Sequence, residues 1–491
     1  MSETPETEST AGPRRSRRWA IPTAAAAVGG LVLAGSVYAL TDGGADEQSA
    51  PGPTGTASET GSPPTDGDGG DGGDDPAADP DDETLDPMLL ECMAPEGGPG
   101  AGDGDGDGSI PDADIDVQVD AIADIVEEER GLAGVDELDV EFVTLDEVQE
   151  RAVELNAEEA DPEEAAEDAR ILAALGAVEP GIDLVEAQLD ALDAGVSGFY
   201  NTETEELVIG STSMDALGAV TTSHELVHAM ADASFELPSV ESIDESAGAD
   251  AGLAALSAIE GDASLYSQRF ALNHLPFNEL LGLDATAAEA DAALDELPYV
   301  IGRSLLFPYE EGLMFSCAVF LDGGWDAIDR TYDDPPTTTA QVLFPERYLA
   351  GEEAVDVRDP EGPAGWDVLE SDTFGAADLL FLLEAPGDDE SAALPDPVDR
   401  VAAWAGGELT AWTDGDATAV AVMLADRGGT TPLCETVTDF YAAAYPGAER
   451  SADDGGTTFE GPEQAAVVRC DGTEVALGIG PDAATAAATV R

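Results

Sequence analysis

The chain has 491 residues, of which 106 are acidic and 17 are basic, and its formal net charge is -89. Every basic residue is arginine, so the sequence contains no lysine. Such an excess of negative charge disfavours binding to nucleic acid and to anionic membrane surfaces. Because 43% of the residues are hydrophobic, we expect a folded protein adapted to molar salt, which shortens the Debye length to roughly 3 Å.

The N-terminus resembles a membrane anchor or an export signal. Four arginines lie in the basic segment 1–18, and an uncharged, alanine-rich stretch follows at 19–40. That stretch is long enough to cross a bilayer, and the positive-inside rule places everything after Thr41 outside the cell. Cleavage after Ala39 would make it an export signal instead. We favour a single-pass anchor with the C-terminal part at the cell surface.

The next segment has the composition of a linker. From Asp42 to about Pro87 the residues are mostly Gly, Pro, Asp, Ser and Thr, with almost no large apolar side chain. A segment of this kind cannot bury enough apolar surface to form a core. We therefore expect residues 41–109 to form a disordered, acidic stalk.

The folded part is expected to be α+β and to begin near Ile110. A helix over Val117–Glu129, a strand over Leu138–Leu145 and helices near 146–156 and 163–176 fit the apolar periodicity. We assign 110–374 to one domain and 375–491 to a smaller C-terminal α+β lobe. The elements expected in that lobe are strands at Glu408–Trp412, Thr418–Leu424, Ala465–Cys470 and Glu474–Ile479 and a helix at Glu435–Ala444.

Two of the three histidines in the chain lie in one pentapeptide, His224-Glu225-Leu226-Val227-His228. Residues four apart share one face of a helix, so His224 and His228 can bind one zinc ion. Glu225 is then placed next to the metal. The HExxH pattern therefore predicts a zinc-binding helix.

The residues before the motif predict a hairpin that leads into this helix. Segments 198–200 and 206–209 have the composition of two strand arms around a polar turn. The run Ser211-Thr212-Ser213 offers N-cap oxygens, and Asp215 lies three residues after Thr212, as in a capping box. The motif would then lie well inside the helix.

A catalytic zinc site needs a third protein ligand. A second helix is expected over Ala251–Phe270, and it carries Glu260 next to Gly261. The glycine would let this helix approach the first one closely. Glu260 is therefore the predicted third ligand, and Glu245 and Asp250 are the alternatives.

Residues 195–275 resemble the gluzincin metallopeptidases, in which HExxH supplies two ligands and a glutamate on a later helix, often in Glu-Gly-x-Ala, supplies the third. The resemblance implies a zincin-like catalytic domain at 110–374, a zinc cofactor and hydrolysis of peptide bonds. The chain departs from the pattern in two ways. The gap between His228 and Glu260 is long, at 31 residues (229–259), and no Glu-x-x-x-Asp follows.

The run Phe307–Tyr348 is similar to a segment in a family of haloarchaeal and bacterial surface proteins that also carry an HExxH helix. In that family the segment typically ends in His-Pro-Glu, whereas Phe344 stands at the histidine position here. This resemblance implies a surface protein of a halophilic archaeon. We expect Trp325 and Tyr332, in the same run, to be core aromatics.

The expected chemistry follows from the metal. Zinc lowers the pKa of water and polarises a carbonyl group, and Glu225 would act as general base. His274, Tyr266 and Tyr309 are candidates for stabilising the oxyanion, and the sequence does not choose among them. The strand at 198–209 is expected to pair with an extended protein or peptide substrate.

A non-catalytic surface protein that keeps a zincin-like fold for structural or binding purposes is the alternative. A purely structural zinc site needs its ligands but has no need of a base, so the intact Glu225 favours the enzyme.

Four cysteines outside the cell permit two disulfides in three connectivities. We favour Cys434 with Cys470 and Cys92 with Cys317, the second of which would attach the end of the stalk to the domain that follows. No two cysteines have Cys-x-x-Cys spacing, so none is expected to bind zinc.

Overall fold

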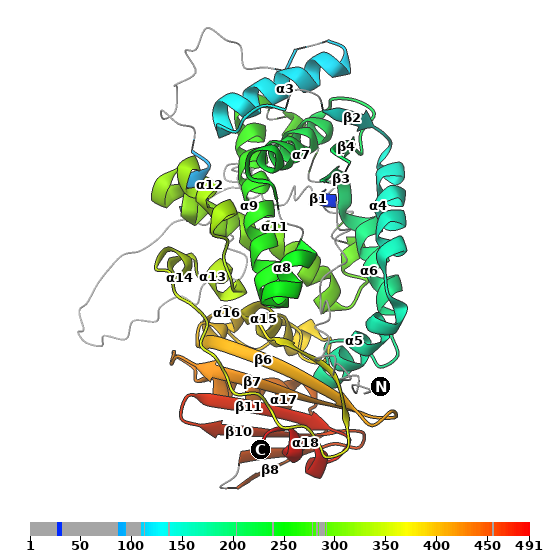
Figure 1. Ribbon diagram of the computed structural model, residues 1–491, viewed down its shortest axis with the longest axis vertical. Helices are drawn as coiled ribbons and strands as arrows, with labels where there is room; N and C mark the ends of the chain where they lie inside the picture. Colours follow the sequence, from blue (N-terminus) through cyan, green and yellow to red (C-terminus); the bar gives the residue numbers. More distant parts are fainter. Residues whose placement is uncertain are drawn as a thin grey trace, which may run out of the picture.

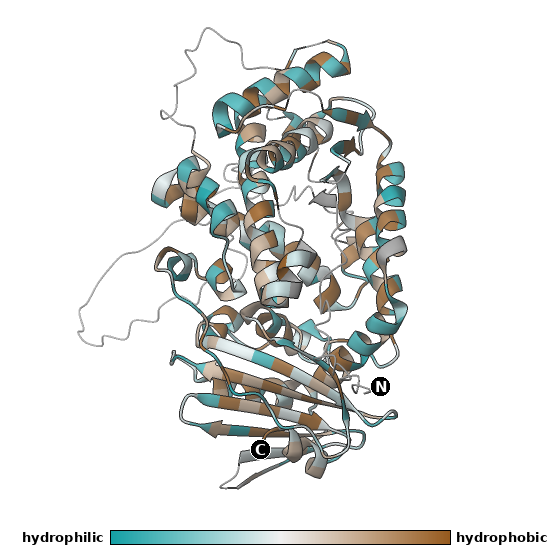
Figure 2. Cartoon of the chain, in the orientation of Figure 1, coloured by the Kyte–Doolittle hydropathy of each residue, from teal (hydrophilic) through white to brown (hydrophobic). Residues whose placement is uncertain are grey.

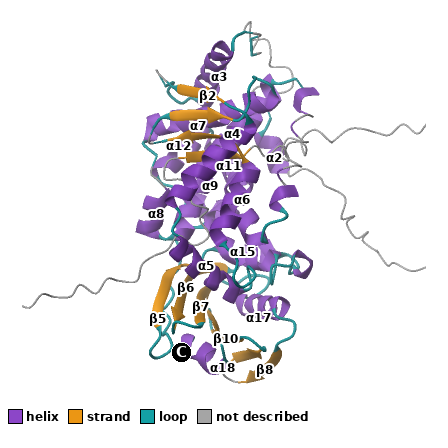
Figure 3. Cartoon of the chain, turned by 90° about the vertical axis from the view of Figure 1, so that its right-hand side faces the viewer, coloured by secondary structure: helices purple, strands orange, loops and turns teal. Residues whose placement is uncertain are grey.

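The structure is a computed structural model, and its α+β class agrees with the expectation from sequence (Figure 1). A helical region that contains a small sheet lies at one end, and a larger sheet lies at the other (Figures 1 and 3). The residues that the structure describes are 27–31, 87–94, 110–111, 113–135, 138–202, 204–237, 240–276, 278–280, 283, 290, 292–453 and 456–491. Most of the expected stalk and most of the stretch 19–40 lie outside these residues.

The small sheet is mixed and has the strand order β1-β3-β4-β2. Strands β3 (Val196–Asn201) and β4 (Glu206–Ile209) form the antiparallel hairpin that the sequence predicts. Strand β2 (Asp139–Phe142) pairs with β4 in parallel. Strand β1 (Ala27–Leu31) pairs with β3 antiparallel, so these five residues of the apolar N-terminal stretch are a β-strand here.

The helices of this region mostly match the expected ones. Two features differ from the expectation from sequence, the N-cap of α7 and the presence of α6. Asp215 itself is the N-cap of α7 and accepts a hydrogen bond from the Gly218 N–H. The expected cap at Ser211-Thr212-Ser213 is therefore wrong. The hydroxyl groups of Ser211 and Ser213 donate to Asp215 instead. Helix α6 was not expected from the sequence. The helices are α3 (Ile115–Arg130), α4 (Leu145–Glu159), α5 (Pro162–Leu175), α6 (Leu184–Gly195), α7 (Ala216–Phe235), α8 (Val240–Ala247), α9 (Ala249–His274), α11 (Tyr299–Gly323), α12 (Trp325–Asp333), α13 (Thr339–Leu343) and α14 (Pro345–Leu349).

Helices α9 and α11 run side by side through the centre of the molecule (Figures 1 and 3). They cross at two glycines, because a Cβ on Gly261 would collide with the carbonyl oxygen of Gly312. The close approach that Gly261 allows is therefore to α11, and the expectation that it faces the HExxH helix is wrong. Within the described part of the chain, α11 is the one helix long and apolar enough to cross a membrane, and most of it is buried inside the protein.

The C-terminal lobe is built on a seven-stranded antiparallel sheet in the order β5-β6-β7-β11-β10-β9-β8. Hydrophobic residues are frequent along its strands (Figure 2), and most residues of the central strands β7 and β11 are buried, as in a sheet with both faces covered. Its elements are β5 (Asp367–Thr373), α15 (Ala376–Glu384), α16 (Pro397–Val401), β6 (Trp404–Thr413), β7 (Thr418–Asp426), α17 (Leu433–Ala444), β8 (Glu449–Asp453), β9 (Gly456–Glu460), β10 (Ala465–Asp471), β11 (Glu474–Gly480) and α18 (Ala483–Thr489).

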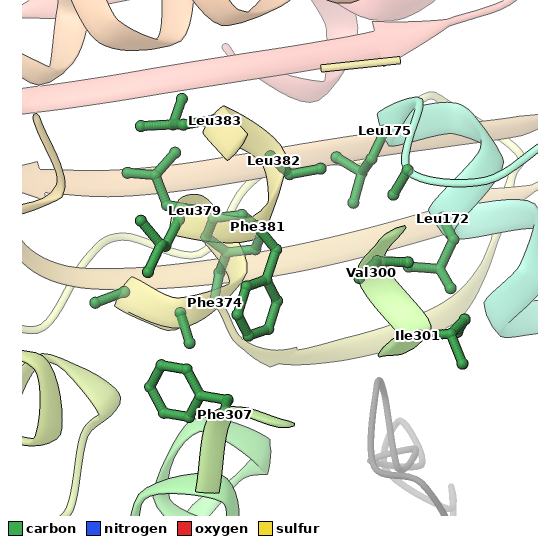
Figure 4. Close-up of a cluster of buried hydrophobic side chains, with 14 of the residues drawn as sticks. Leu172, Leu175, Val300, Ile301, Phe307, Phe374, Leu379, Phe381, Leu382 and Leu383 are labelled. Carbon is green, nitrogen blue, oxygen red and sulfur yellow. The ribbon is translucent and has the colours of Figure 1, made fainter. Parts of the chain in front are cut away.

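One continuous apolar core joins the lobe to the helical region. Figure 4 shows Phe307 of α11 near Phe374 and Phe381 at the α15 end of the lobe, and Leu172 of α5 next to Val300 of α11. The rings of Phe307 and Phe381 meet edge to face with centroids 5.7 Å apart. The position of the central helices is therefore set partly by the lobe.

Both expected disulfides are present, Cys92–Cys317 and Cys434–Cys470. The first attaches the short helix α2 (Pro87–Cys92) to α11. Arg269 of α9 also donates to the carbonyl oxygen of Cys92, so both central helices hold this segment.

Candidate metal centre

Helices α7 and α9 bring three side chains to one point. His224 and His228 lie one turn apart on α7, and Glu260 faces them from α9. The two imidazole Nε2 atoms are 3.1 Å apart, and each lies close to Oε2 of Glu260, at 3.2 Å from His224 and 3.3 Å from His228. The three residues form a group that could hold a metal ion.

The spacing of these atoms fits a metal better than hydrogen bonding. Ligands about 2.0–2.1 Å from a tetrahedral zinc ion lie roughly 3.3 Å from one another, close to the three separations observed. Hydrogen bonds alone do not account well for the three distances. If both Nε2 atoms carry a proton toward Glu260, two N–H donors face each other at 3.1 Å. A cation between the three atoms removes this conflict.

The three residues are almost completely shielded from solvent. His224, His228 and Glu260 are each 3% exposed or less. Burial raises the pKa of Glu260, but His228 and His224 favour its charged form by more, so its pKa lies below the ordinary value. An ionised carboxylate and two imidazoles are the donor set that zinc prefers among hard and borderline ligands.

Nδ1 of His228 is buried and has no hydrogen-bond partner among the described residues. Metal-binding histidines commonly donate from the second ring nitrogen to a carboxylate or carbonyl group, which fixes the ring. Among the described residues, the polar contacts of His228 are therefore those of Nε2 to Glu260 and His224.

Glu225 lies between the histidines and the small sheet. It is fully buried, and its Oε1 atom would be 3.5 Å from a Cβ placed on Gly198 of β3. Such a Cβ would also lie 3.0 Å from the carbonyl oxygen of Val208 and closer still to Thr221. Glycine at 198 is therefore what lets α7 and Glu225 come this close to the β3 strand.

Of the three candidates for oxyanion stabilisation, the structure brings one to the metal centre. The ring of Tyr309, on α11, stacks against His224 with centroids 6.3 Å apart. Tyr266 packs on Trp325 and Phe270 instead. His274 lies 14 residues after Glu260 on the same helix, about 21 Å away at the usual rise per residue.

His274 lies instead at the C-terminal end of α9, where it is partly buried. Its Nε2 lies 3.0 Å from a carboxylate oxygen of Glu129 on α3. The expectation that His274 contributes to the site is therefore not met.

The two alternative ligands are placed elsewhere. Asp250 lies in the first turn of α9 and accepts hydrogen bonds from the backbone N–H and the hydroxyl of Thr339. Glu245 belongs to α8, which precedes α9. The ring of Phe344 packs against the guanidinium of Arg347.

A buried charge network behind Glu260 was not anticipated. Arg130 of α3 is fully buried and donates through two nitrogens to Asp262, each at 2.8 Å. Tyr332 donates to the same carboxylate at 2.7 Å, and Trp325 stacks on the guanidinium, as expected of core aromatics. The network fixes α9 two residues from Glu260. A contact across 132 residues leaves no local pattern in the sequence.

No protein-family model matches this chain, no curated protein matches it in sequence, and no solved structure matches it in fold. Fold and site therefore define the class by themselves. The protein is an α+β protein in which helices α7 and α9 bury a His-His-Glu group that could hold a metal ion.

Proposed function

We propose that the protein is a zinc-dependent peptidase of gluzincin-like design, with His224, His228 and Glu260 as the metal ligands. The observation that carries this proposal is the combination of a compact His-His-Glu group with a buried glutamate next to the first histidine and against a strand of the small sheet. Zinc bound there supplies a Lewis acid, which lowers the pKa of water and polarises a carbonyl group.

The residues of the chain supply the rest of the chemistry. Glu225 accepts a proton from the attacking water and passes it to the leaving amine. Tyr309, next to His224, is in place to donate a hydrogen bond to the oxyanion that forms at the carbonyl. An extended peptide substrate is held by strand pairing at the edge of β3 that faces away from β4.

The alternative is a non-catalytic surface protein that binds metal for structural reasons. A structural site favours four closed protein ligands, whereas three protein ligands leave room for water. Among the described residues, three that could hold a metal ion lie at this point, and this number supports the catalytic proposal.

The location also remains a proposal. Two disulfides are typical of proteins that fold in an oxidising compartment, so they support an extracellular position for the folded part. A single-pass anchor at 19–40 is proposed to hold it at the membrane.

A Glu225→Gln variant tests the catalytic role. The amide keeps the shape of the side chain but cannot accept a proton, so we expect unchanged zinc content and a loss of peptidase activity by at least about 100-fold, at the lower end of general-base effects. Activity is measured on denatured protein substrates in molar salt. Glu186→Gln, at an exposed position on α6, is the matched control. If the zinc-bound protein cleaves no substrate, both as the full-length chain and after residues 27–31 have been removed, the non-catalytic alternative replaces this proposal.

A further inference from the structure

The outer edge of β3 is occupied by a segment of the chain itself. Ala27–Leu31 runs antiparallel to β3 as strand β1, in the register Ala27 with Asn201, Val28 with Tyr200 and Gly30 with Gly198. The two strands are separated by 164 residues of sequence (32–195). An apolar segment far away in the sequence has thus been added to the sheet, as in recognition of a peptide by strand addition.

Strand β3 passes beside Glu225 at Gly198. Gly30 of β1 is opposite Gly198, the residue whose missing Cβ leaves space beside Oε1 of Glu225. Strand β1 also contacts α7, the helix that carries both histidines. His224, Glu225, His228 and Glu260 are all 3% exposed or less in this arrangement. A peptide that needs the same edge cannot bind while β1 is there.

The same residues have a second possible environment. Ala27–Leu31 lies inside the uncharged stretch 19–40, which is long enough to cross a bilayer. Within a bilayer the stretch must form a helix, because its backbone groups have no other partners there. It cannot be a membrane helix and pair with β3 at the same time.

The chain between the two positions is long enough for either arrangement. Fifty-five residues (32–86) separate β1 from α2, which is fixed to the folded part by Cys92–Cys317. Fully extended, such a segment spans at most about 180–200 Å. Exchange between the two environments therefore needs no rearrangement of the helices.

We infer that the segment Ala27–Leu31 is a built-in occupant of the substrate edge, which keeps the metal centre closed until the segment is withdrawn into a membrane or removed. This inference rests on the proposed peptidase function and concerns its regulation. Activity would then be confined to chains that have reached the membrane or have lost the segment.

A pair of prolines tests whether β1 occupies the edge. Along a strand, alternate residues direct their N–H groups to the neighbouring strand, so Val28→Pro/Gly29→Pro removes at least one donor to β3 and disrupts the pairing. Ala34→Pro/Gly35→Pro is the control, because it adds the same two prolines to the same apolar stretch outside β1. Both are made in the full chain on a Glu225→Gln background, so that the segment cannot be cut.

The first readout does not depend on catalysis. A fluorescent peptide with the sequence of residues 24–34 is titrated against each full-length protein in molar salt, and hydrogen exchange is followed at residues 196–201. We expect at least 10-fold tighter peptide binding and at least 10-fold faster exchange in Val28→Pro/Gly29→Pro than in the control. Equal binding and equal exchange in the two variants would overturn the inference.

The second readout uses the same prolines with Glu225 intact. Peptidase activity should be at least 10-fold higher in Val28→Pro/Gly29→Pro than in Ala34→Pro/Gly35→Pro. Equal, measurable activity in both would show that the edge does not control the site. If neither variant has activity but the peptide still binds selectively, the peptidase function fails while the occupation of the edge by β1 is upheld.

Discussion

At the scale of single residues, the metal centre depends on the position of one carboxylate. Oε2 of Glu260 is within 3.3 Å of both imidazole Nε2 atoms, and the residue is almost fully buried. Glu260 is held by its neighbours on α9, because Gly261 is packed on α11 and Asp262 is bound by Arg130. The ligand is therefore preorganised by contacts on both sides of it.

Replacing Glu260 with alanine should weaken zinc binding by more than the 10- to 100-fold that loss of an outer-sphere partner typically costs. Asp250→Asn, at one of the alternative ligand positions, is the control and should keep its zinc. Metal content per chain is measured after dialysis against a graded chelator series in molar salt. Unchanged affinity in Glu260→Ala would show that the third ligand is another residue.

The buried carboxyl group of Asp250 leads to a separate prediction, which concerns the pH dependence of stability. Burial is the main cause that raises its pKa to about 6, against about 3.9 in an unfolded chain. The folded protein therefore binds this proton more tightly than the unfolded chain does. Below about pH 4, Asp250 should not lower the free energy of unfolding. As the pH rises through 6, its ionisation should lower that free energy by up to about 3 kcal/mol.

Asp250→Asn removes this term, because the amide oxygen can still accept from Thr339 and carries no charge. The stability difference between the variant and the parent should thus increase in favour of the variant between about pH 4 and pH 7. Denaturant unfolding at several pH values in molar salt measures it. Asp190→Asn, exposed on α6, is the control. A difference that is flat across this range would contradict the prediction.

At the scale of secondary-structure elements, the site depends on the crossing of α9 and α11. Each helix has a glycine at the contact, and a Cβ on Gly312 would collide with the carbonyl oxygen of Ser257. The crossing lies one residue from Glu260 and three residues from Tyr309. Any separation of the two helices moves both side chains relative to His224.

Gly312→Ala should therefore destabilise the protein by about 1–3 kcal/mol, as overpacking typically does, and also weaken zinc binding. Gly302→Ala on the same helix is the control. Its new Cβ would lie 3.5 Å from the nearest atom, so the higher helix propensity of alanine should leave stability equal or slightly increased. Chemical denaturation and zinc titration are run on both variants. Equal behaviour of the two would show that the crossing is not tight.

The elements that could be predicted from sequence are those with local signals. The HExxH pair is set by helix periodicity, and the hairpin of β3 and β4 by two short apolar arms around a polar turn. Contacts between distant segments were harder to predict. The direction of Gly261 depends on which helix lies beside α9, and the distance of His274 from the metal depends on the unbroken length of that helix. Strand β1 lies in a stretch whose composition indicates a membrane helix.

At the scale of the whole molecule, net charge is the dominant property. With 106 acidic residues and 17 arginines, most carboxylates have no basic partner. Several arginines are instead used at buried junctions, as in the Arg130 contact with Asp262 and the Arg303 contact with Glu384. The surface is left with unbalanced negative charge, which opposes the compact state unless salt screens it.

The last prediction concerns salt. At about 0.1 M salt, charges repel one another over a Debye length of about 10 Å, whereas native domains have only about 5–15 kcal/mol of stability. At about 1 M the range falls to roughly 3 Å, so we expect the protein to be folded in molar salt and to unfold on dilution. Zinc held by His224, His228 and Glu260 binds the folded state alone and opposes unfolding, so chelator-treated protein should unfold at a higher salt concentration. Circular dichroism against salt, with and without chelator, measures both effects. Equal folding at about 0.1 M and 3 M would refute the expected salt dependence, and coincident curves would mean that the three residues do not hold metal tightly.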